Sequence, residues 1–107
     1  MSYEIKDGKG IIKEYGFFHT LEFEGEYFNG KKNGKGKEYH YNTGKLIFEG
    51  EYLNENRSGK GIEYDKNGKL IFKGEYLNGK KWNGKGKEYN LDGKLIFVRE
   101  YLNGKKI

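Results

Sequence analysis

The stretch Phe48-Glu49-Gly50-Glu51-Tyr52-Leu53-Asn54 decides the fold of this chain, because close copies of it recur at a fixed interval. The other copies begin at Phe23, Phe72 and Phe97, so the period is 24 or 25 residues. A period of this length is typical of arrays in which each unit is too small to fold alone and stacks on its neighbours. We therefore expect one continuous array whose product is an extended surface.

Each copy alternates apolar and polar residues with period two, which is the pattern of a half-buried β-strand. In the copy quoted above, Phe48, Gly50 and Tyr52 share one face of the strand, whereas Glu49 and Glu51 take the other. The abundance of aromatic residues and glycine also favours strands over helices. The fold class that we predict is therefore all-β.

Turn residues separate these strands and indicate hairpins. Asn54–Ser58 has turn composition, and the equivalent segments contain Asn-Gly, which suits a hairpin turn because both residues tolerate positive φ. A shorter strand, Gly59–Tyr64, follows, and a second turn over 65–68 leads into the next unit. Length differences of one residue fall at Trp82 and around Tyr41, in segments that we interpret as turns.

The repeat divides the whole chain, 1–107, into one array of five segments. We interpret them as a degenerate capping repeat, three full repeats and a terminal half repeat: 1–22, 23–47, 48–71, 72–96 and 97–107. His19 in the cap takes the turn position that Gly68 holds in a full repeat. The half repeat is compatible with a complete chain and with a piece of a longer array, and the similarity of the copies with a natural or a consensus-designed sequence.

Glycines inside predicted strands normally mark a close approach of the backbone to another group. Gly50, Gly59 and Gly61 fall beside Phe48 and Tyr52 in the repeat. We hypothesise that aromatic rings lie flat over these glycines, so that any side chain there would push the ring off the sheet.

The amino-acid composition argues against several kinds of site and partner. The 107 residues contain no cysteine, which excludes disulfides and thiolate metal sites. The net charge is +5, but acidic residues are interleaved with the lysines, which argues against nucleic acid as a partner. No apolar run approaches the length of a membrane span, and the polar start does not resemble a signal peptide. We expect an intracellular protein that is soluble or peripheral to a membrane.

The motifs Phe-x-Gly-Glu-Tyr, Asn-Gly-Lys and Gly-Lys-Gly resemble those of the MORN (membrane occupation and recognition nexus) repeat family. Glu63–Leu70 is similar to the second MORN subtype, which also occurs in bacterial proteins, some of them labelled antitoxins. The resemblance covers essentially the whole chain, and only residues 1–22 and Arg99 depart from it. It implies an elongated, twisted and grooved antiparallel sheet of consecutive β-hairpins. MORN arrays occur in scaffolds at membranes and the cytoskeleton, beside lipid kinase domains and in methyltransferases.

The predicted function is that of a non-catalytic protein-interaction or scaffold module. An aromatic groove would accept a partner peptide or protein, or the end strand Phe97–Leu102 would pair with a partner or with a second copy as a homodimer. The residues that we expect to line the groove are the repeated rings: Phe23, Tyr27, Phe48, Tyr52, Phe72, Tyr76, Phe97 and Tyr101.

Two alternative functions remain open from the sequence. Lysine-rich hairpin tips would let the protein bind anionic membrane lipids peripherally, and the same rim would serve a protein partner. The residues of this rim are Lys31, Lys32, Lys80, Lys81 and Trp82. The subtype resemblance also suggests an antitoxin or immunity protein that binds a toxin.

Enzymatic chemistry finds little support in the sequence. The segment 79–85 has the spacing of a phosphate-binding P-loop, but Gly86 replaces the required Ser or Thr and no helix follows. His19 and His40, the only histidines, fall in or near turns without a cluster of metal ligands. No hydroxyl stands with a His and a carboxylate, and the regular Glu residues suit cross-strand pairs with lysine. We predict no cofactor, no metal and no catalysis.

Overall fold

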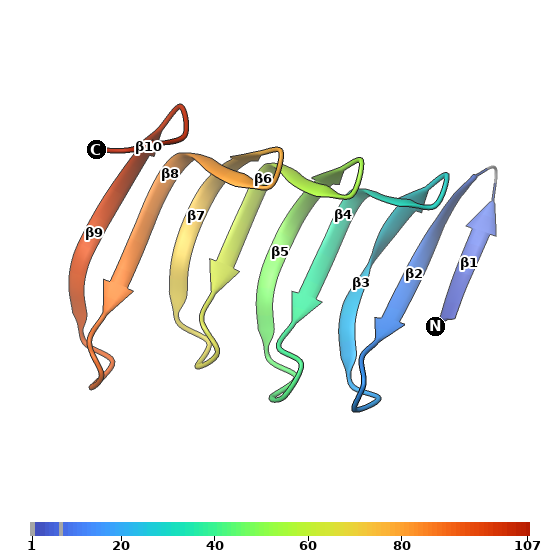
Figure 1. Cartoon of the computed structure of the whole chain (residues 1–107), viewed down its shortest axis with the longest axis horizontal. Helices are drawn as coiled ribbons and strands as arrows, with labels where there is room; N and C mark the ends of the chain where they lie inside the picture. Colours follow the sequence, from blue (N-terminus) through green and yellow to red (C-terminus); the bar gives the residue numbers. More distant parts are fainter. Residues whose placement is uncertain (1, 7) are drawn as a thin grey trace.

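A computed structural model describes residues 2–6 and 8–107, with side chains described from Gly8 onward. They form a single open sheet of ten antiparallel strands arranged in chain order, β1 to β10 (Figure 1). The predicted all-β class and hairpin array are confirmed, and Met1 and Asp7 of the predicted cap lie outside the described residues. The strands are β1 Ser2–Lys6, β2 Lys9–Tyr15, β3 Leu21–Phe28, β4 Lys31–Tyr39, β5 Leu46–Leu53, β6 Asn56–Tyr64, β7 Leu70–Leu77, β8 Lys80–Tyr89, β9 Leu95–Leu102 and β10 Lys105–Lys106.

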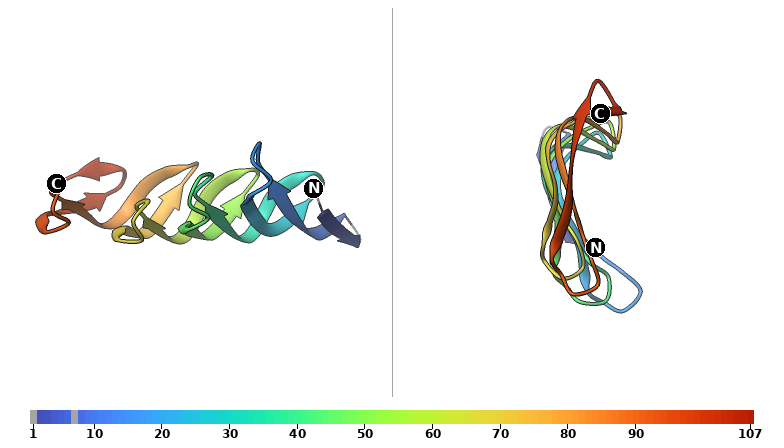
Figure 2. Two further views of the ribbon diagram at one scale, coloured as in Figure 1. Left: turned by 90° about the horizontal axis from the view of Figure 1, so that it is seen from below. Right: turned by 90° about the vertical axis from the view of Figure 1, so that its left-hand side faces the viewer.

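The sheet is one layer thick and elongated, with extents of 45 × 32 × 14 Å. Seen end-on it is bent into a crescent, and the two ends of the chain lie at opposite ends of the long axis (Figure 2). Because no second layer covers it, the sheet must build its core from side chains lying within its own bend.

The turns after the long strands are tighter than the sequence suggested. Asn54 and Glu55 both have positive φ, 48° and 80°, and β6 begins at Asn56 rather than at Gly59. The predicted five-residue turn Asn54–Ser58 is therefore wrong: two residues make the turn, because left-handed conformations at both central positions match the twist of the strands.

Asn56 and Arg57, which were expected in the turn, pair with β5, and a bulge follows them within the strand. Gly50 pairs with Gly61 but Tyr52 pairs with Arg57, so three residues of β6 lie opposite Glu51. The bulge frees a backbone amide, and Glu51 Oε1 accepts a hydrogen bond from Lys60 N at 2.7 Å. The Glu of the Phe-x-Gly-Glu-Tyr motif thus stabilises the irregular backbone of its own hairpin.

The extra residue Trp82 also lies inside a strand, β8, and not in a turn as predicted. Next to it the pairing slips. Gly74 pairs with Gly84, and Phe72 lies opposite Gly86, whereas Phe48 in the preceding hairpin lies opposite Glu63. Trp82 is the unpaired residue of a smaller bulge, between Lys81 and Asn83, and beyond it the β7–β8 ladder stays shifted relative to the preceding hairpin.

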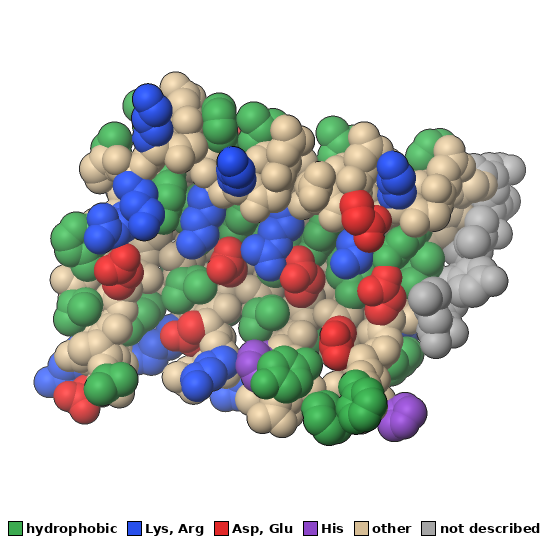
Figure 3. Space-filling model, viewed as in Figure 1, with side chains coloured by type: hydrophobic (Ala, Val, Ile, Leu, Met, Phe, Trp, Pro, Cys, Tyr) green, Lys and Arg blue, Asp and Glu red, His purple; other side chains and the backbone are tan. Residues whose placement is uncertain are grey.

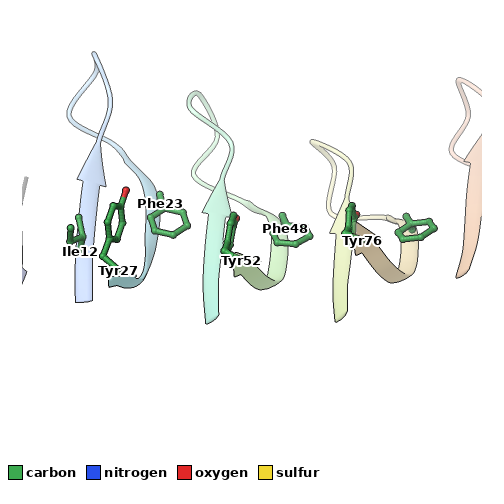
Figure 4. Close-up of a cluster of buried hydrophobic side chains, with 7 residues drawn as sticks. Ile12, Phe23, Tyr27, Phe48, Tyr52 and Tyr76 are labelled. Carbon is green, nitrogen blue, oxygen red and sulfur yellow. The ribbon is translucent and has the colours of Figure 1, made fainter. Parts of the chain in front are cut away.

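The core is a row of side chains repeated once per hairpin (Figure 4). Phe48 and Phe72 are completely buried, with no solvent-exposed surface. The buried apolar residues are Ile12, Phe23, Tyr27, Phe48, Tyr52, Phe72 and Tyr76, with Tyr101 packed against them. We refer to the side of the sheet that carries these rings as the aromatic face.

Candidate functional site

Each buried phenylalanine lies between two tyrosines, one from its own hairpin and one from the next. The centroid of the Phe48 ring is 5.6 Å from that of Tyr52 and 5.3 Å from that of Tyr76, and both contacts are edge-to-face. Phe23 and Phe72 repeat this arrangement. Edge-to-face pairs add to the free energy gained by burial, so the rings join successive hairpins into one body.

Glycines provide the room for these rings. A Cβ atom added to Gly61 would lie 2.7 Å from Phe48 Cε1 and 2.9 Å from Tyr76 Cε1, closer than packed carbons allow. A Cβ on Gly50 would lie 2.7 Å from Phe48 Cζ. The ring-over-glycine hypothesis is thus confirmed for these two glycines. It is wrong for Gly59, which lies against the Glu51 side chain and is required because its φ is 94°.

A cation from the second strand of each hairpin covers each ring from outside. Lys32 Nζ lies 4.2 Å from the centroid of the Phe23 ring, and Arg57 Cζ lies 4.0 Å from that of Phe48. Lys81 Nζ lies 5.4 Å from the centroid of Phe72. Cations over ring faces are attracted by the ring quadrupole, so the aromatic face presents positive charge above a covered apolar row.

Arg57 is the centre of a polar network that joins residues of four strands, β4 to β7. Its Nε and Nη2 each donate to Glu38 of β4 at 3.0 Å, and its Nη1 donates to Glu63 of β6 at 3.1 Å. Tyr76 O–H donates to the same Glu63 oxygen at 2.7 Å, and Tyr52 O–H donates to Glu38. Each carboxylate therefore accepts bonds from a cation and from a tyrosine of the following hairpin.

This network shifts the pKa values of its members. Burial would raise the pKa of Glu38, but the hydrogen bonds from Arg57 and Tyr52 outweigh it and hold that pKa below the usual value. Burial, and then the hydrogen bonds to carboxylates, raises the pKa of Tyr27, Tyr52 and Tyr76. For Arg57, burial opposes the charged form, but hydrogen bonding to Glu38 raises the pKa. The shifts favour an ionised Glu38 beside a charged Arg57 and a protonated Tyr52.

The structure places the predicted groove residues in two different environments. The rings of the first three repeats are the core itself and are covered, so a partner on this face would meet the cations above them: Phe23, Tyr27, Phe48, Tyr52, Phe72 and Tyr76. Phe97 is 47% exposed and Tyr101 is half-buried. Of the predicted groove residues, only the C-terminal pair therefore offers aromatic surface, because among the described residues only the short strand β10 pairs with the outer edge of β9.

The predicted lysine rim does not form one exposed patch. Lys31 and Lys80 are exposed, but Lys32 and Lys81 are half-buried over aromatic rings. The Trp82 indole is half-buried against the next turn, where a Cβ on Gly104 would lie 2.8 Å from Trp82 Cζ3. The indole therefore packs over a neighbouring turn.

The most exposed apolar side chains lie on the opposite edge of the sheet, which the sequence did not single out. Phe17 in the β2–β3 loop is 90% exposed, and Leu91 in the β8–β9 loop is fully exposed. Phe18 packs edge-to-face against Phe17, and Tyr41 stacks on His40. Figure 3 shows the two histidines (purple) beside hydrophobic side chains (green) along this edge. The repeat period identifies the aromatic residues of the strands, but it does not show that aromatic residues in the loops, such as Phe17, are exposed.

The glutamates of the aromatic face were also missed, although a signal was present. A Glu-Tyr pair ends the second strand of each unit: Glu14-Tyr15, Glu38-Tyr39, Glu63-Tyr64 and Glu88-Tyr89. On the other face the expected cross-strand Lys–Glu pairs do form. Lys37 Nζ lies 3.6 Å from Glu49 Oε2, and Lys13 Nζ lies 3.5 Å from Glu24 Oε2.

Comparisons with known proteins do not indicate a function for this chain. No family model, no curated protein and no solved structure matches this chain. Among residues 8–107 no three His, Asp or Glu side chains lie close enough together to hold a metal ion. Within the described part of the chain there is no helix of the length and hydropathy that a membrane crossing requires.

Proposed function

We propose that this chain is a non-catalytic protein-interaction module that binds its partner chiefly through strand β9. The observation that carries the proposal is the exposure of this strand. Apolar side chains are exposed on both of its faces: Leu95, Ile96, Phe97, Val98 and Leu102. A strand of this composition at the end of a sheet is a template for pairing with another strand.

The outer edge of β9 is largely open. The short strand β10 pairs only with Tyr101 and Leu102, and Ile107 N donates to Glu100 O at 2.9 Å. Among the described residues, no strand pairs with the outer edge of 95–98. Phe97 is the one repeat phenylalanine here without a tyrosine from a following hairpin. A partner strand that carries an aromatic side chain would complete the repeated packing.

Strand addition gives a partner affinity through main-chain hydrogen bonds and specificity through alternate side chains. The partner is either another protein or a second copy of this chain, which would form a homodimer through 97–102. MORN arrays, which this chain resembles, occur in scaffolds. This resemblance also supports an interaction role. The cation-covered aromatic face is the second surface that a bound peptide would contact.

The test uses the double variant Ile96→Lys/Val98→Lys, in which two exposed apolar side chains of β9 become charged. Because both are exposed, the isolated fold should tolerate the change. The matched control is Lys85→Gln/Lys87→Gln, which alters exposed side chains of the paired strand β8. Sedimentation over a concentration series measures self-association, and backbone hydrogen exchange reports whether the amides of 95–98 become protected.

Another protein as partner is tested with a displayed peptide library. Peptides selected on the wild-type chain should lose binding to the β9 double variant and keep it to the β8 control. Concentration-dependent dimers with protected 95–98 amides support the second copy as partner. A monomer whose selected peptides bind both variants equally would contradict the proposal.

A second candidate function is peripheral binding to anionic membranes, and the exposed loop residues favour it. Phe17, Phe18 and Leu91 project from loops on one long edge, where Lys45, Lys66 and Lys94 are also exposed. Aromatic and aliphatic side chains beside lysines suit the membrane–water interface. This edge lies opposite the predicted lysine rim.

Vesicle flotation distinguishes the two edges. Phe17→Ser/Phe18→Ser should abolish binding to vesicles containing phosphatidylserine if the loop edge makes the contact, and Lys31→Gln/Lys80→Gln should do so if the rim does. Binding should weaken as salt rises, because screening reduces attraction between exposed charges and the surface. Failure of the wild-type chain to float at low salt would remove this candidate function.

A further inference from the structure

A pocket of about 550 Å³ lies at the C-terminal end of the aromatic face. It is bordered by β8, β9 and the loops that precede β7 and β9. The cationic residues on this face of the pocket outnumber the acidic ones, so its local charge is positive: Lys69, Lys81 and Arg99 against Asp65 and Glu88.

The central hairpin shows what a full repeat holds at the equivalent place. There, Glu63 Oε1 accepts from Arg57 Nη1 at 3.1 Å and from Tyr76 O–H at 2.7 Å. One carboxylate oxygen thus joins the cation of one hairpin to the tyrosine of the next. Lys81 and Tyr101 occupy the corresponding cation and tyrosine positions at the C-terminal end, and Glu88 the carboxylate position.

Two departures from the repeat remove the carboxylate from this place. Arg99 stands where Gly74 does in the preceding repeat, and its Nε donates to Glu88 Oε1 at 2.9 Å. The insertion of Trp82 also lengthens the separation of Lys81 from Glu88 to seven residues, against six from Arg57 to Glu63. Within the described part of the chain, no carboxylate bonds to Lys81 Nζ or to Tyr101 O–H.

The two groups nevertheless remain neighbours on the aromatic face. Lys81 Nζ lies 5.7 Å from the centroid of the Tyr101 ring and 5.4 Å from that of Phe72. Both side chains are half-buried, and their strands are held together by the β8–β9 ladder. They therefore form a preorganised pair of donors in a positively charged pocket.

We propose that this pocket binds a carboxylate from another molecule. One carboxylate oxygen would accept hydrogen bonds from the Lys81 ammonium and the Tyr101 hydroxyl. The guanidinium N–H groups of Arg99 that do not bond to Glu88 would provide a second positively charged partner. Charge-assisted hydrogen bonds of this kind are among the stronger ones in proteins. The source of the carboxylate is an acidic peptide side chain or a free carboxylic acid. Binding here does not require strand addition at β9.

The probe for a peptide side chain is N-acetyl-L-glutamate methylamide, titrated into the isotope-labelled chain at low ionic strength and followed by amide chemical shifts. Its neutral match is the glutamine analogue. We expect saturable shifts at Lys81, Gly86 and Tyr101 with the glutamate analogue alone. Glutarate and inorganic phosphate test free acids. Tighter binding of glutarate than of the glutamate analogue assigns the site to a free acid, and tighter binding of phosphate than of either would overturn the choice of carboxylate.

Three variants test whether Lys81 and Tyr101 hold the ligand. Lys81→Gln and Tyr101→Phe should each weaken binding about tenfold, since each removes one hydrogen bond to a charged group. Lys80→Gln is the control, because it removes the same charge from an adjacent, exposed position. Weakening by Lys80→Gln as large as that by Lys81→Gln, with Tyr101→Phe without effect, would show a diffuse charge effect and overturn the proposal, as would the absence of saturable shifts. Chemical shifts outside the pocket report whether each variant is folded.

Discussion

The two arginines of this chain stand on the same face of the same sheet in opposite situations. Arg57 bonds to two glutamates and lies over the ring of Phe48, which a tyrosine of the next hairpin covers. Arg99 bonds to one glutamate, and its Cζ lies 4.5 Å from the centroid of the Phe97 ring. Among the described residues, no tyrosine of a following hairpin packs against Phe97. The difference shows that in this fold a residue's environment is set by the following hairpin as much as by its own.

The phenylalanines beneath these arginines make the same point. Phe48 is completely buried and Phe97 is about half exposed, although both begin closely related local sequences. In a repeat array each unit contributes a surface, and only the contact between units makes a core. The comparison therefore predicts that equivalent substitutions have large effects in the centre and small ones at the C-terminal end.

The largest difference is expected for Phe48→Ala against Phe97→Ala. Removing the buried ring of Phe48 should lower the free energy of unfolding by about 3–5 kcal/mol, from lost burial and the cavity left behind. Phe97→Ala should cost under about 1 kcal/mol because water already reaches half of its ring. Urea denaturation followed by circular dichroism measures both. Equal losses would mean that Phe97 is covered in solution by a second copy.

The next largest difference is expected for a single added methyl group. Gly61→Ala should cost about 2–3 kcal/mol, because its Cβ would lie 2.7 Å from Phe48 Cε1. At Gly86 the nearest atoms to an added Cβ are Ile71 O at 3.3 Å and Tyr101 Cε1 at 3.4 Å, so Gly86→Ala should cost under about 1 kcal/mol.

Neither glycine has a φ that alanine avoids, so this pair isolates the contacts of the added methyl group. Thermal melts of the two variants provide the measurement. A destabilisation of Gly86→Ala as large as that of Gly61→Ala would contradict the looser packing at the C-terminal end.

Arg57→Gln should cost about 2 kcal/mol at neutral pH, since it leaves two partly buried glutamates without their shared cation. The effect should depend on pH. The folded-state pKa of Glu38 is lowered, so its contribution is present above the unfolded pKa and is lost as pH falls through the folded value. The difference between wild type and variant should therefore shrink below about pH 4. A constant difference across acid denaturation curves would argue against the ion pair as its source.

The array could be predicted from the sequence because its signals are local and repeated. Phe48, Gly50 and Tyr52 follow one another at intervals of two residues, as do their counterparts in the other units, and alternation alone places them on one face. The covering of Phe48 by Tyr76 could not be predicted, because it depends on how one hairpin lies against the next. The exposure of Phe97 and the role of Glu63 depend on the same contact between hairpins.

The slip at Trp82 escaped prediction for a different reason. The extra residue Trp82 lies at a bulge within strand β8, and alternation alone does not reveal a bulge. An insertion was therefore assigned to a turn, and the change in pairing between Phe72 and Gly86 was not foreseen.

Tyr76→Phe tests the link between hairpins at a single hydroxyl. Loss of its hydrogen bond to Glu63 should cost about 1 kcal/mol, whereas Tyr101→Phe should cost under about 0.5 kcal/mol because its hydroxyl bonds no carboxylate of the described residues. The pKa of Tyr76 is raised by burial and by Glu63, so unfolded tyrosine releases its proton first as pH rises. Wild-type stability should then fall above pH 10, and the decline should be shallower in Tyr76→Phe. Denaturation midpoints between pH 8 and 11 measure this, and parallel curves would contradict it.

The smallest effect is expected where the C-terminal end is changed toward the centre. Arg99→Gly places at this position the glycine that full repeats have there, as at Gly50 and Gly74. The change removes the partly exposed ion pair with Glu88 and the cation over the half-exposed ring of Phe97. Such contacts are each worth a fraction of a kcal/mol, so the loss should be about 0.5 kcal/mol. The variant also frees Glu88 to bond with Tyr101, as Glu63 bonds with Tyr76, and this would offset part of the loss. Denaturation curves of the two chains provide the measurement, and a loss above about 2 kcal/mol would show that Arg99 is as integral to its end of the sheet as Arg57 is to the centre.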